Sequence, residues 1–360
     1  LNQTITLNRL TPRTFGEGSF TLSATSSSGL PVSYSSSNPL VATISGNTVT
    51  IEGAGTTTIT ASQVGNETYN PATPVDQNLL VNKATPAITW NTPSPIVYGT
   101  PLSGTQLNAT ASVAGSFTYT PAAGTVLNAG ASQVLSVNFT PTDITNYNTV
   151  NGTTVVIEVT KATLTATANN QSRTYGAANP AFTISYSGFV NGDTPSALGA
   201  APTAGSVATT VSPVGTYPIT VTGGADNNYN FTYVNGTLTV NKATLTASAD
   251  NKSRLYGAAN PTLTITYTGF VNSEDASVLD TAPIATTTAL ATSNVGSYPI
   301  TVSGGDDSNY TFNYVPGTLA INKAILSATA ENKTRTYGTA NPAFTISYSG
   351  FVNGDTPSVL

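Results

Sequence analysis

Residues 174–194 read TYGAANPAFTISYSGFVNGDT, and residues 336–356 read TYGTANPAFTISYSGFVNGDT. The two copies differ only at Ala177 and Thr339, and a drifted third copy runs from Leu255 to Ser273. Such repetition within one chain has two explanations. Either a chemical site is needed more than once, or a unit of fold is repeated in an array.

A fixed period runs through the C-terminal part of the chain. The same interval separates three Lys-Ala steps, three Tyr-Gly steps and three phenylalanines, which are Lys161, Lys242 and Lys323, Tyr175, Tyr256 and Tyr337, and Phe189, Phe270 and Phe351. An earlier Lys-Ala step, at Lys83, precedes Lys161 by a slightly shorter interval. A constant period is the signature of a repeat architecture. We therefore predict five modules, numbered one to five, at residues 1–83, 84–161, 162–242, 243–323 and 324–360, the last of them partial.

Duplication explains the opening stretch more simply than two selected sites do. Residues 162–198 and 324–360 differ at only seven of 37 positions, and most of the differences are mild. In the drifted copy the Asn-Gly-Asp of residues 191–193 becomes the Asn-Ser-Glu-Asp of residues 272–275. Because the most site-like part of the stretch is the part that varies, we interpret the stretch as a fold element.

Polar and apolar residues alternate with period two in module three. Ile219 and Val221 alternate with threonines, and Ile184 and Tyr186 alternate with serine. This pattern is typical of strands half-buried in an antiparallel sheet. The Asn235-Gly236 pair between two such runs predicts a hairpin. Six or seven short strands in about 80 residues suit a two-sheet sandwich, so the predicted fold class is all-β, a tandem array of immunoglobulin-like antiparallel β-sandwich domains.

The composition narrows the possible functions. The 360 residues include no His, no Cys and no Met, and only 8% are charged. Catalysis would need a base, a partnered nucleophile or a metal cluster, and only scattered carboxylates are present. A net charge of −5 gives no basic surface for nucleic acid, and no apolar run is long enough to span a membrane. We predict a protein that is not an enzyme, with no nucleic-acid partner and no membrane span in this segment.

Residues 161–243 resemble the MBG ("mostly bacterial immunoglobulin-like") repeat family, through a pattern that begins KATLTATANNQSRTYGAANPAFTISYSGFVNGDT and ends GTYPITVTGGADNNYNFTYVNGTLTVNKA. Residues 242–324 match the pattern again, and residues 324–360 match its first half. Modules one and two resemble other bacterial immunoglobulin-like repeats that accompany this family. The resemblance implies a large adhesin-like protein, extracellular or at the bacterial cell surface, frequently from Bacteroidota-like bacteria with type IX secretion.

Calcium is the cofactor for which the sequence offers ligands, because it takes oxygens from carboxylates, amides and loop carbonyls. Residues 223–230 read GGADNNYN and residues 304–311 read GGDDSNYT, which gives the candidate ligands Asp226, Asn228, Asp306 and Asp307. Asp and Asn also favour turns for purely structural reasons. Without calcium, no cofactor is expected.

Lysines and the single tryptophan have structural interpretations as well. The boundary lysines are more typical of a solvated linker, or of a partner for a neighbouring loop, than of an isopeptide bond, which needs a buried Lys, Asn and acid together. Trp90 alternates with Ile88, which indicates core packing rather than a platform for sugars.

A tyrosine precedes the boundary lysine at nearly the same spacing in every complete module. These tyrosines are Tyr69, Tyr147, Tyr229 and Tyr310, each after a short polar run. The pattern is similar to the tyrosine corner of immunoglobulin-like sandwiches, in which the hydroxyl bonds to nearby backbone. We expect a structural role for all four.

We expect the chain to act as a non-catalytic extended stalk that presents a terminal functional domain outside these residues. It begins LNQTITL, without an initiator Met, so we expect a longer precursor. Two alternatives stay open. The modules themselves bind surface glycans or protein partners through their loops, or they form a polymeric fibre or homo-oligomer by edge-strand association. Neighbouring domains of the same chain are expected partners in each case.

The corner interpretation predicts the effect of Tyr229→Phe. Loss of one hydrogen bond should lower the stability of module three by roughly 1 kcal/mol, without changing any binding. A melting curve identical to that of the unmodified chain would contradict this role.

Overall fold

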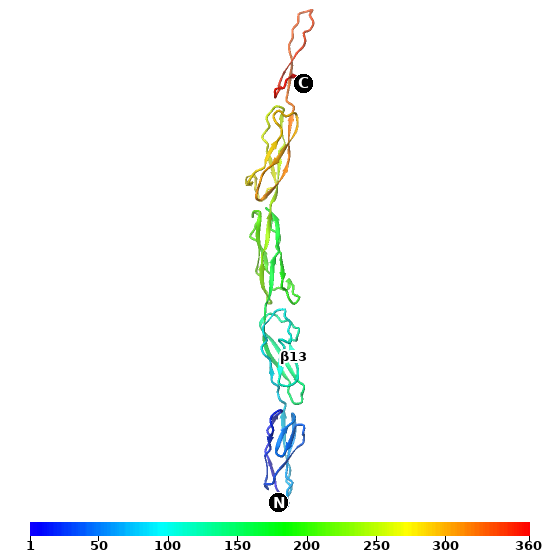
Figure 1. The fold of residues 1–360 in the computed structure, drawn as a ribbon, viewed down its shortest axis with the longest axis vertical. Coiled ribbons are helices and arrows are strands. Elements are labelled where there is room, and N and C mark those ends of the chain that lie inside the picture. Colours follow the sequence, from blue (N-terminus) through cyan, green and yellow to red (C-terminus); the bar gives the residue numbers. More distant parts are fainter. The chain divides into compact units, whose positions relative to one another are not determined.

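The computed structural model describes residues 1–360, and almost all of its regular structure is β-strand (Figure 1). The helical elements are three single 3-10 turns, η1 (Pro195–Ala197), η2 (Ala276–Val278) and η3 (Pro357–Val359). None of them is long or apolar enough to cross a lipid bilayer. The prediction of an all-β chain is confirmed.

By its contacts the chain divides into two compact units. The first unit comprises residues 1–164, 188–199 and 225–230, and the second comprises residues 165–187, 200–224 and 231–360. The division runs through the predicted module three, so the five module bounds stay a prediction. Each boundary lysine directly follows the end of a strand, and these strands are β9 (Val75–Asn82), β15 (Val150–Thr160), β22 (Gly236–Asn241) and β29 (Gly317–Asn322).

Module four lies wholly in the second unit and is a sandwich of two sheets. Its other strands are β23 (Ala243–Ala249), β24 (Lys252–Leu255), β25 (Ile265–Thr268), β26 (Ile284–Thr287), β27 (Gly296–Ser303) and β28 (Tyr310–Val315). One sheet has the order β25-β23-β28 and the other β24-β29-β27-β26. Between them Ala247, Ile300 and Leu319 are fully buried in one apolar cluster, as the alternation of apolar with polar residues requires.

The first strand of module four is divided between the two sheets. β23 pairs with β28 and β24 pairs with β29, both in parallel, whereas the other pairings of the module are antiparallel. The first two strands of the module are therefore hydrogen-bonded to its last two, and the end of β24, at Leu255, lies beside Asn322 at the boundary with module five.

Module three repeats this register one period earlier in the chain. Its strands are β16 (Ala162–Ala168), β17 (Gln171–Thr174), β18 (Ile184–Ser187), β19 (Thr203–Gly205), β20 (Gly215–Thr222), β21 (Tyr229–Val234) and β22. Within the second unit the order β17-β22-β20-β19 matches that of module four. The pairing of Gln171 with Leu238 likewise corresponds to that of Lys252 with Leu319.

The hairpin predicted at Asn235-Gly236 is wrong. β22 pairs with β17 and β20, and β21 is not a member of that sheet, so the chain changes sheets at this step. Gly236 is needed for close packing rather than for a turn, because a Cβ there would lie 2.5 Å from the carbonyl oxygen of Ala168. The glycine of the Asn-Gly pair therefore marks a close backbone contact and not a tight turn.

Modules one and two belong to the first unit. Module one has three sheets. In the first, β1 (Ile5–Leu7) pairs with β4 (Ala24–Ser26), and in the second, β7 (Thr48–Ile51) lies between β3 (Phe20–Thr21) and β6 (Ala42–Ser45). The strand order of the third is β2 (Arg13–Thr14), β9, β8 (Gly55–Ser62) and β5 (Ser33–Ser36). In module two, β10 (Ile88–Thr89) pairs with β12 (Thr110–Ala111), and a second sheet orders β11 (Ile96–Val97), β15, β14 (Gly130–Pro141) and β13 (Gly115–Thr120). Trp90 packs against the core of module two, as predicted.

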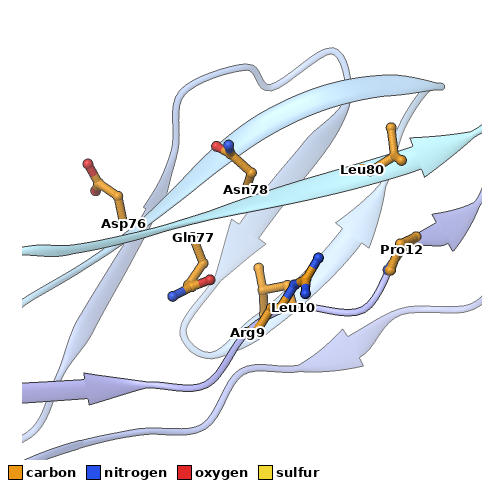
Figure 2. A pocket seen from close by; sticks show the side chains of 7 residues that line it. All are labelled: Arg9, Leu10, Pro12, Asp76, Gln77, Asn78 and Leu80. Atoms are coloured by element: carbon orange, nitrogen blue, oxygen red, sulfur yellow. The ribbon is translucent and has the colours of Figure 1, made fainter.

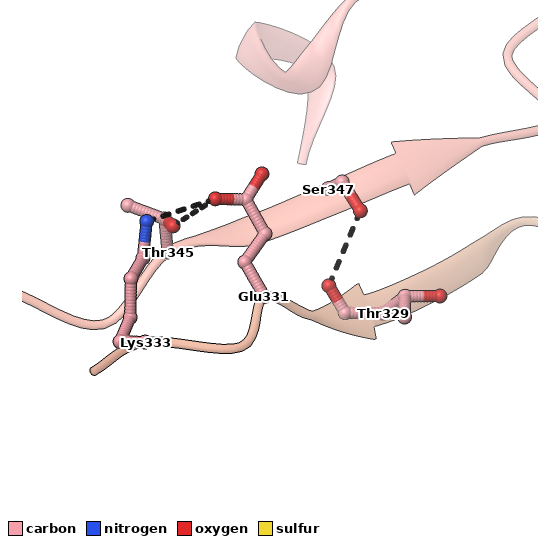
Figure 3. A network of polar contacts seen from close by, with 5 residues as sticks. All are labelled: Thr329, Glu331, Lys333, Thr345 and Ser347. Atoms are coloured by element: carbon pink, nitrogen blue, oxygen red, sulfur yellow. Dashed lines mark hydrogen bonds and ion pairs between the residues drawn. The ribbon is translucent and has the colours of Figure 1, made fainter.

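Module five consists of one pair of strands, β30 (Ser327–Ala330) and β31 (Ile346–Ser349), followed by η3. Figure 3 shows the polar network at one end of this pair: the Glu331 carboxylate accepts from Lys333 Nζ at 3.0 Å and from the Thr345 hydroxyl, while Ser347 donates to the Thr329 carbonyl. Ile325 and Phe344, by contrast, are 79% and 78% exposed. The pair is held by its backbone pairing and by these polar contacts.

Candidate functional site at the module junctions

The junction of modules three and four lies within the second unit and is built around one carboxylate. The Tyr175 hydroxyl donates to Glu274 Oε1 at 2.5 Å, and the Tyr310 hydroxyl donates to Glu274 Oε2 at 2.6 Å. Tyr175 belongs to module three, whereas Glu274 and Tyr310 belong to module four. The Tyr310 hydroxyl also accepts from the Val271 N–H at 3.0 Å. One side chain therefore ties the tyrosines of two successive modules together.

The junction of modules two and three, within the first unit, has the same arrangement. The hydroxyls of Tyr98 and Tyr229 both donate to Asp193 Oδ2, each at 2.8 Å. The Val190 N–H donates to the Tyr229 hydroxyl at 3.1 Å. Asp193 and Glu274 are one period apart. Asp193, with the shorter side chain, accepts both hydroxyls at one oxygen, whereas Glu274 accepts one hydroxyl at each of its two oxygens. We call each set of two tyrosines and a carboxylate a tyrosine clamp.

The clamp tyrosines are buried and meet edge to face. Tyr98 and Tyr229 have ring centroids 5.5 Å apart at 85°, and Tyr175 and Tyr310 have centroids 5.7 Å apart at 89°. All four are at most 6% exposed. Aromatic pairs of this geometry contribute about 0.5–1.5 kcal/mol beyond the area they bury.

The backbone places the first tyrosine of each clamp beside the module boundary. Tyr98 N–H donates to the Thr160 carbonyl at 2.8 Å, and Tyr175 N–H donates to the Asn241 carbonyl at the same distance. Thr160 and Asn241 are the residues just before the boundary lysines Lys161 and Lys242. The Tyr-Gly step is thus fixed to the last strand of its own module, at the point where the next module begins.

The glycine of the Tyr-Gly step lets the next module approach closely. Gly99 has φ of +93° and Gly176 has φ of +81°. A Cβ at Gly99 would lie 2.5 Å from a methyl of Val190, and one at Gly176 would lie 2.4 Å from a methyl of Val271. Any other residue would be strained by its backbone conformation and would also collide with the following module.

A buried arginine braces the loop that faces the junction. Arg173 Nε donates to Asn179 Oδ1 at 2.8 Å, and a terminal nitrogen of its guanidinium donates to the Thr209 carbonyl. Asn179 in turn donates to the Ala208 carbonyl at 2.7 Å. Arg254, Asn260, Ala289 and Leu290 repeat these bonds in module four. Arg173 therefore holds the loop of residues 208–210 close to the turn at Tyr175, and all of its hydrogen-bond acceptors there are uncharged.

Two further contacts recur at three junctions. An asparagine before the corner tyrosine accepts from a backbone N–H of the preceding module: Asn146 from Ala54 at 2.7 Å, Asn228 from Ala129 at 2.9 Å and Asn309 from Val214 at 2.9 Å. The boundary lysine donates to a carbonyl of the following module: Lys83 to Ile144, Lys161 to Asp226 and Lys242 to Asp307, at 2.6–2.7 Å. Of the two interpretations of these lysines, the structure supports a partner for a neighbouring loop.

Module one joins module two without a carboxylate. Phe15 stands in the place of the first tyrosine and meets the Tyr147 ring edge to face, with centroids 5.4 Å apart. Since Phe15 has no hydroxyl, the junction keeps the aromatic contact and lacks the clamp. Tyr147 and Tyr69 are half-buried, and neither hydroxyl makes a hydrogen bond in the structure. Of the four predicted structural tyrosines, Tyr229 and Tyr310 thus belong to clamps, whereas Tyr69 and Tyr147 do not.

The candidate calcium ligands serve the turn that presents the corner tyrosine. Asp226 Oδ1 accepts from the N–H groups of Asn228 and Tyr229, and its Oδ2 accepts from Gly199 N–H. Asp307 accepts in the same way from Asn309, Tyr310 and Asp280. Asp306 is fixed through its backbone to Thr281. Carboxylates that face N–H donors cap turns, and no three acidic residues gather into a metal cluster; calcium binding stays a prediction.

Burial and the shared acid also determine the electrostatics of the clamps. Burial, with a contribution from the Asp193 carboxylate, raises the pKa of Tyr229 to about 12, and burial with Glu274 does the same for the pKa of Tyr310. Burial is likewise the main cause that raises the pKa of Tyr98 and of Tyr175. The four hydroxyls therefore keep their protons, and remain hydrogen-bond donors, well above neutral pH.

One hollow lies in module one and has the features of an open surface groove. Its volume is about 630 Å³, and it is lined by Arg9, Leu10, Pro12, Asp76, Gln77, Asn78 and Leu80. Figure 2 shows Gln77 on the Arg9 side of β9 and Asp76 and Asn78 on the other. Its polar groups do not converge on one point and no aromatic ring lines it, so it offers no platform for a sugar.

The Tyr-Gly steps also identify the family. A model of the MBG domain of the YGX type matches residues 164–239, 245–320 and 326–360, which is just over half of the chain. This chain belongs to the MBG domain family. A model of the intimin immunoglobulin-like domain matches residues 18–64. The resemblance to MBG repeats preceded by an immunoglobulin-like repeat is confirmed. The Tyr175-Gly176 step of the first MBG repeat contributes to the clamp between modules three and four.

Solved structures resemble the MBG array only weakly. Sidekick-1 immunoglobulin domains 1–5 are 12% identical over 66% of this chain and 58% of that chain, with a TM-score of 0.27. Drosophila N-cadherin EC1-4 is 10% identical over 88% and 99%, with a TM-score of 0.21, and the S-layer protein rSbsC(31-844) is 14% identical over 96% and 63%, with a TM-score of 0.21. The chain thus spans less than two thirds of the Sidekick-1 and S-layer structures. A search of curated proteins finds no match.

The most informative residues of the MBG junction were missed by sequence reasoning. Asp193 was interpreted as part of a variable tail, and Tyr175 only as a marker of the repeat. The signal was present, because an acid recurs with the period of the repeat at Asp193, Glu274 and Asp355. The residues around this position differ between the copies, but each copy has a carboxylate there.

The glycine contact predicts a specific effect of Gly176→Ala. The added Cβ would push Val271 away from the junction, at a cost of about 1–3 kcal/mol for overpacking. Hydrogen exchange at the Val271 amide, which the Tyr310 hydroxyl protects, should become about tenfold faster or more.

Gly338→Ala is the matched control for this substitution. Gly338 has φ of +84° and nothing within 4 Å of its missing Cβ, so the change brings backbone strain without the collision. Exchange at Val271 should stay unchanged in this variant. Equal acceleration in both variants would show that the contact does not matter.

The raised pKa values predict a loss of stability in alkali. An unfolded tyrosine loses its proton near pH 10, whereas Tyr229 and Tyr310 keep theirs to about 12. The folded state binds more protons in this window, so the stabilisation is complete below pH 10 and is lost as the pH rises from about 10 to about 12. Denaturant titrations across this range, combined with tyrosinate absorbance, measure it. In Tyr310→Phe the loss should be smaller; an identical pH dependence would contradict the assignment.

Proposed function

We propose that the chain is a non-catalytic spacer of a bacterial cell-surface or secreted adhesin-like protein, and that it presents a functional domain outside these residues. The tyrosine clamp carries the proposal, because it couples module two to module three and module three to module four. Secretion by the type IX route forms part of the same proposal, and it rests on the family alone.

The junction contacts suit a load-bearing spacer. Each clamp contributes two hydrogen bonds to a charged acceptor, and a bond of this type is worth about 1.5–3 kcal/mol. An aromatic pair, an asparagine bond and a lysine bond add to each clamp. No residues intervene between the boundary lysine and the next strand, since β16 begins at Ala162 and β23 at Ala243. A junction of this kind restricts bending far more than a flexible linker does.

Distance measurements across one junction test the proposal. The chain has no cysteine, so Val134→Cys in module two and Ala197→Cys in module three, both exposed, give specific sites for a pair of spin labels. We expect a narrow distribution of distances in the otherwise unmodified chain. Adding Tyr98→Phe with Asp193→Ala removes the clamp and should broaden the distribution.

Tyr119→Phe is the control, because it removes a hydroxyl that accepts from Ala109 N–H inside module two. It should leave the distribution as narrow as before. A broad distribution in the chain that carries only the labels would contradict the spacer function. Reproducible binding of the array to surface glycans would favour the alternative in which the modules themselves bind.

A further inference from the structure

A tight turn holds the carboxylate of the clamp between modules two and three. The Asp193 N–H donates to the Val190 carbonyl at 3.0 Å, which closes a turn with Asn191 and Gly192 at its centre. Both central residues have positive φ, +57° at Asn191 and +77° at Gly192. This combination defines a type I′ turn, for which Asn-Gly is a preferred pair. The position of the Asp193 carboxylate in the clamp therefore depends on the shape of this turn.

Asn191 and Gly192 also form the pair of residues that is most prone to spontaneous deamidation. In this reaction the backbone nitrogen of the residue after an asparagine attacks the side-chain amide carbon, and glycine hinders the attack least because it has no Cβ. Both residues are exposed to solvent. The Gly192 N–H makes no hydrogen bond, and no atom lies within 4 Å of the place that a Cβ would occupy. The attacking nitrogen is therefore free, and the chain around it has room to rearrange.

Of the three other Asn-Gly pairs in the chain, two are held by strands. Asn151-Gly152 lies in β15, where the glycine N–H donates to a side-chain oxygen at 2.9 Å. Asn235-Gly236 forms the step into β22, and its glycine is buried and paired with β20. The attack requires the asparagine backbone to rotate, and the hydrogen bonds of a sheet oppose this rotation until the strand opens. The third pair, Asn353-Gly354, is the copy of the Asn191 turn in module five.

Module four has the same turn with a less reactive pair. The Glu274 N–H donates to the Val271 carbonyl at 3.0 Å, and the central residues Asn272 and Ser273 have φ of +55° and +63°. The serine side chain crowds the attack that a glycine permits. Ser273 also shows that a residue with a side chain can occupy this turn. The two complete clamps therefore share a turn and differ in its chemical lifetime.

We propose that Asn191 is a site of spontaneous deamidation, and that its isoaspartate product opens the clamp between modules two and three. The Gly192 nitrogen loses its proton to solvent and bonds to the Asn191 Cγ. The side-chain nitrogen takes up a proton and leaves as ammonia. Water then hydrolyses the cyclic imide at either carbonyl carbon, which gives aspartate or isoaspartate. No electrons are transferred, and water is the co-reactant.

The isoaspartate form changes the backbone of the turn itself. Its main chain runs through the former side-chain carbons and is longer by one atom, so it no longer fits the spacing that a type I′ turn requires between its carbonyl and its N–H. Both clamp tyrosines donate to Asp193 Oδ2 at 2.8 Å, and displacement of that carboxylate leaves them without their acceptor. Buried hydroxyls without a partner destabilise the contact between the modules. The aspartate form keeps the length of the backbone and the turn.

Peptide mapping of the full chain after prolonged incubation at mildly alkaline pH tests the site. Deamidation changes the mass of a peptide, and labelling by isoaspartyl methyltransferase identifies the isoaspartate form. We expect conversion at Asn191 to be faster by about tenfold or more than at Asn151 or Asn235, which strands protect. The Val190 N–H donates to the Tyr229 hydroxyl. As isoaspartate accumulates, hydrogen exchange at this amide should therefore become about tenfold faster.

Gly192→Ser and Ser273→Gly exchange the reactive pair between the two turns. In Gly192→Ser, conversion at Asn191 should slow about tenfold, because the side chain hinders the attack. Exchange at Val190 should then stay constant during the incubation. In Ser273→Gly, Asn272 should become a second site of conversion, whereas in the unmodified chain it should stay intact.

Three results would overturn the proposal. The first is conversion at Asn151 or Asn235 that is as fast as at Asn191. The second is accumulation of isoaspartate at Asn191 without any change of exchange at Val190. The third is failure of Ser273→Gly to make Asn272 reactive, because the pair would then not set the rate. None of these results alters the spin-label distances expected in freshly prepared chain, so this proposal and the spacer function fail or stand separately.

Discussion

A carboxylate that accepts hydrogen bonds from two buried tyrosine hydroxyls is the interaction on which the joining of the MBG modules depends. It requires an acid and a tyrosine from one module and a second tyrosine from the preceding one, with each hydroxyl 2.5–2.8 Å from a carboxylate oxygen. The second tyrosine reaches it only because a glycine follows, which allows a valine of the next module to pack against the backbone. The backbone bond of that tyrosine to the last strand then fixes the distance to the boundary lysine.

The stretch at residues 174–194 contacts two neighbouring modules, one through each of its ends. Tyr175 and Gly176 contact module four, within the second unit, whereas Val190 and Asp193 contact module two, within the first. A substitution at either end of the stretch therefore acts on a different neighbour. Both ends of the stretch are therefore interface residues, and strand β18 lies between them.

Local patterns predicted the strands, because burial of one face imposes period two on the sequence. Ile219 and Val221 were assigned to a strand on that basis, and both are buried in β20. Contacts between distant segments leave no such local signal. The Tyr229 hydroxyl bonds to backbone as expected, at Val190, but its bond to the Asp193 carboxylate in the same loop was not predicted. The hairpin prediction at Asn235-Gly236 was wrong for a related reason. The sequence alone does not distinguish a glycine that close packing requires from a glycine that a turn requires.

The fixed period of the clamp has an evolutionary consequence. Module three contains both halves of the interface, since Tyr175 faces the following module and Asp193 and Tyr229 face the preceding one, so a copy of this unit brings both halves with it. Unequal recombination between the nearly identical copies would add or remove whole units and leave every new boundary functional. The number of modules in the array can therefore change in discrete steps, at the level of the gene.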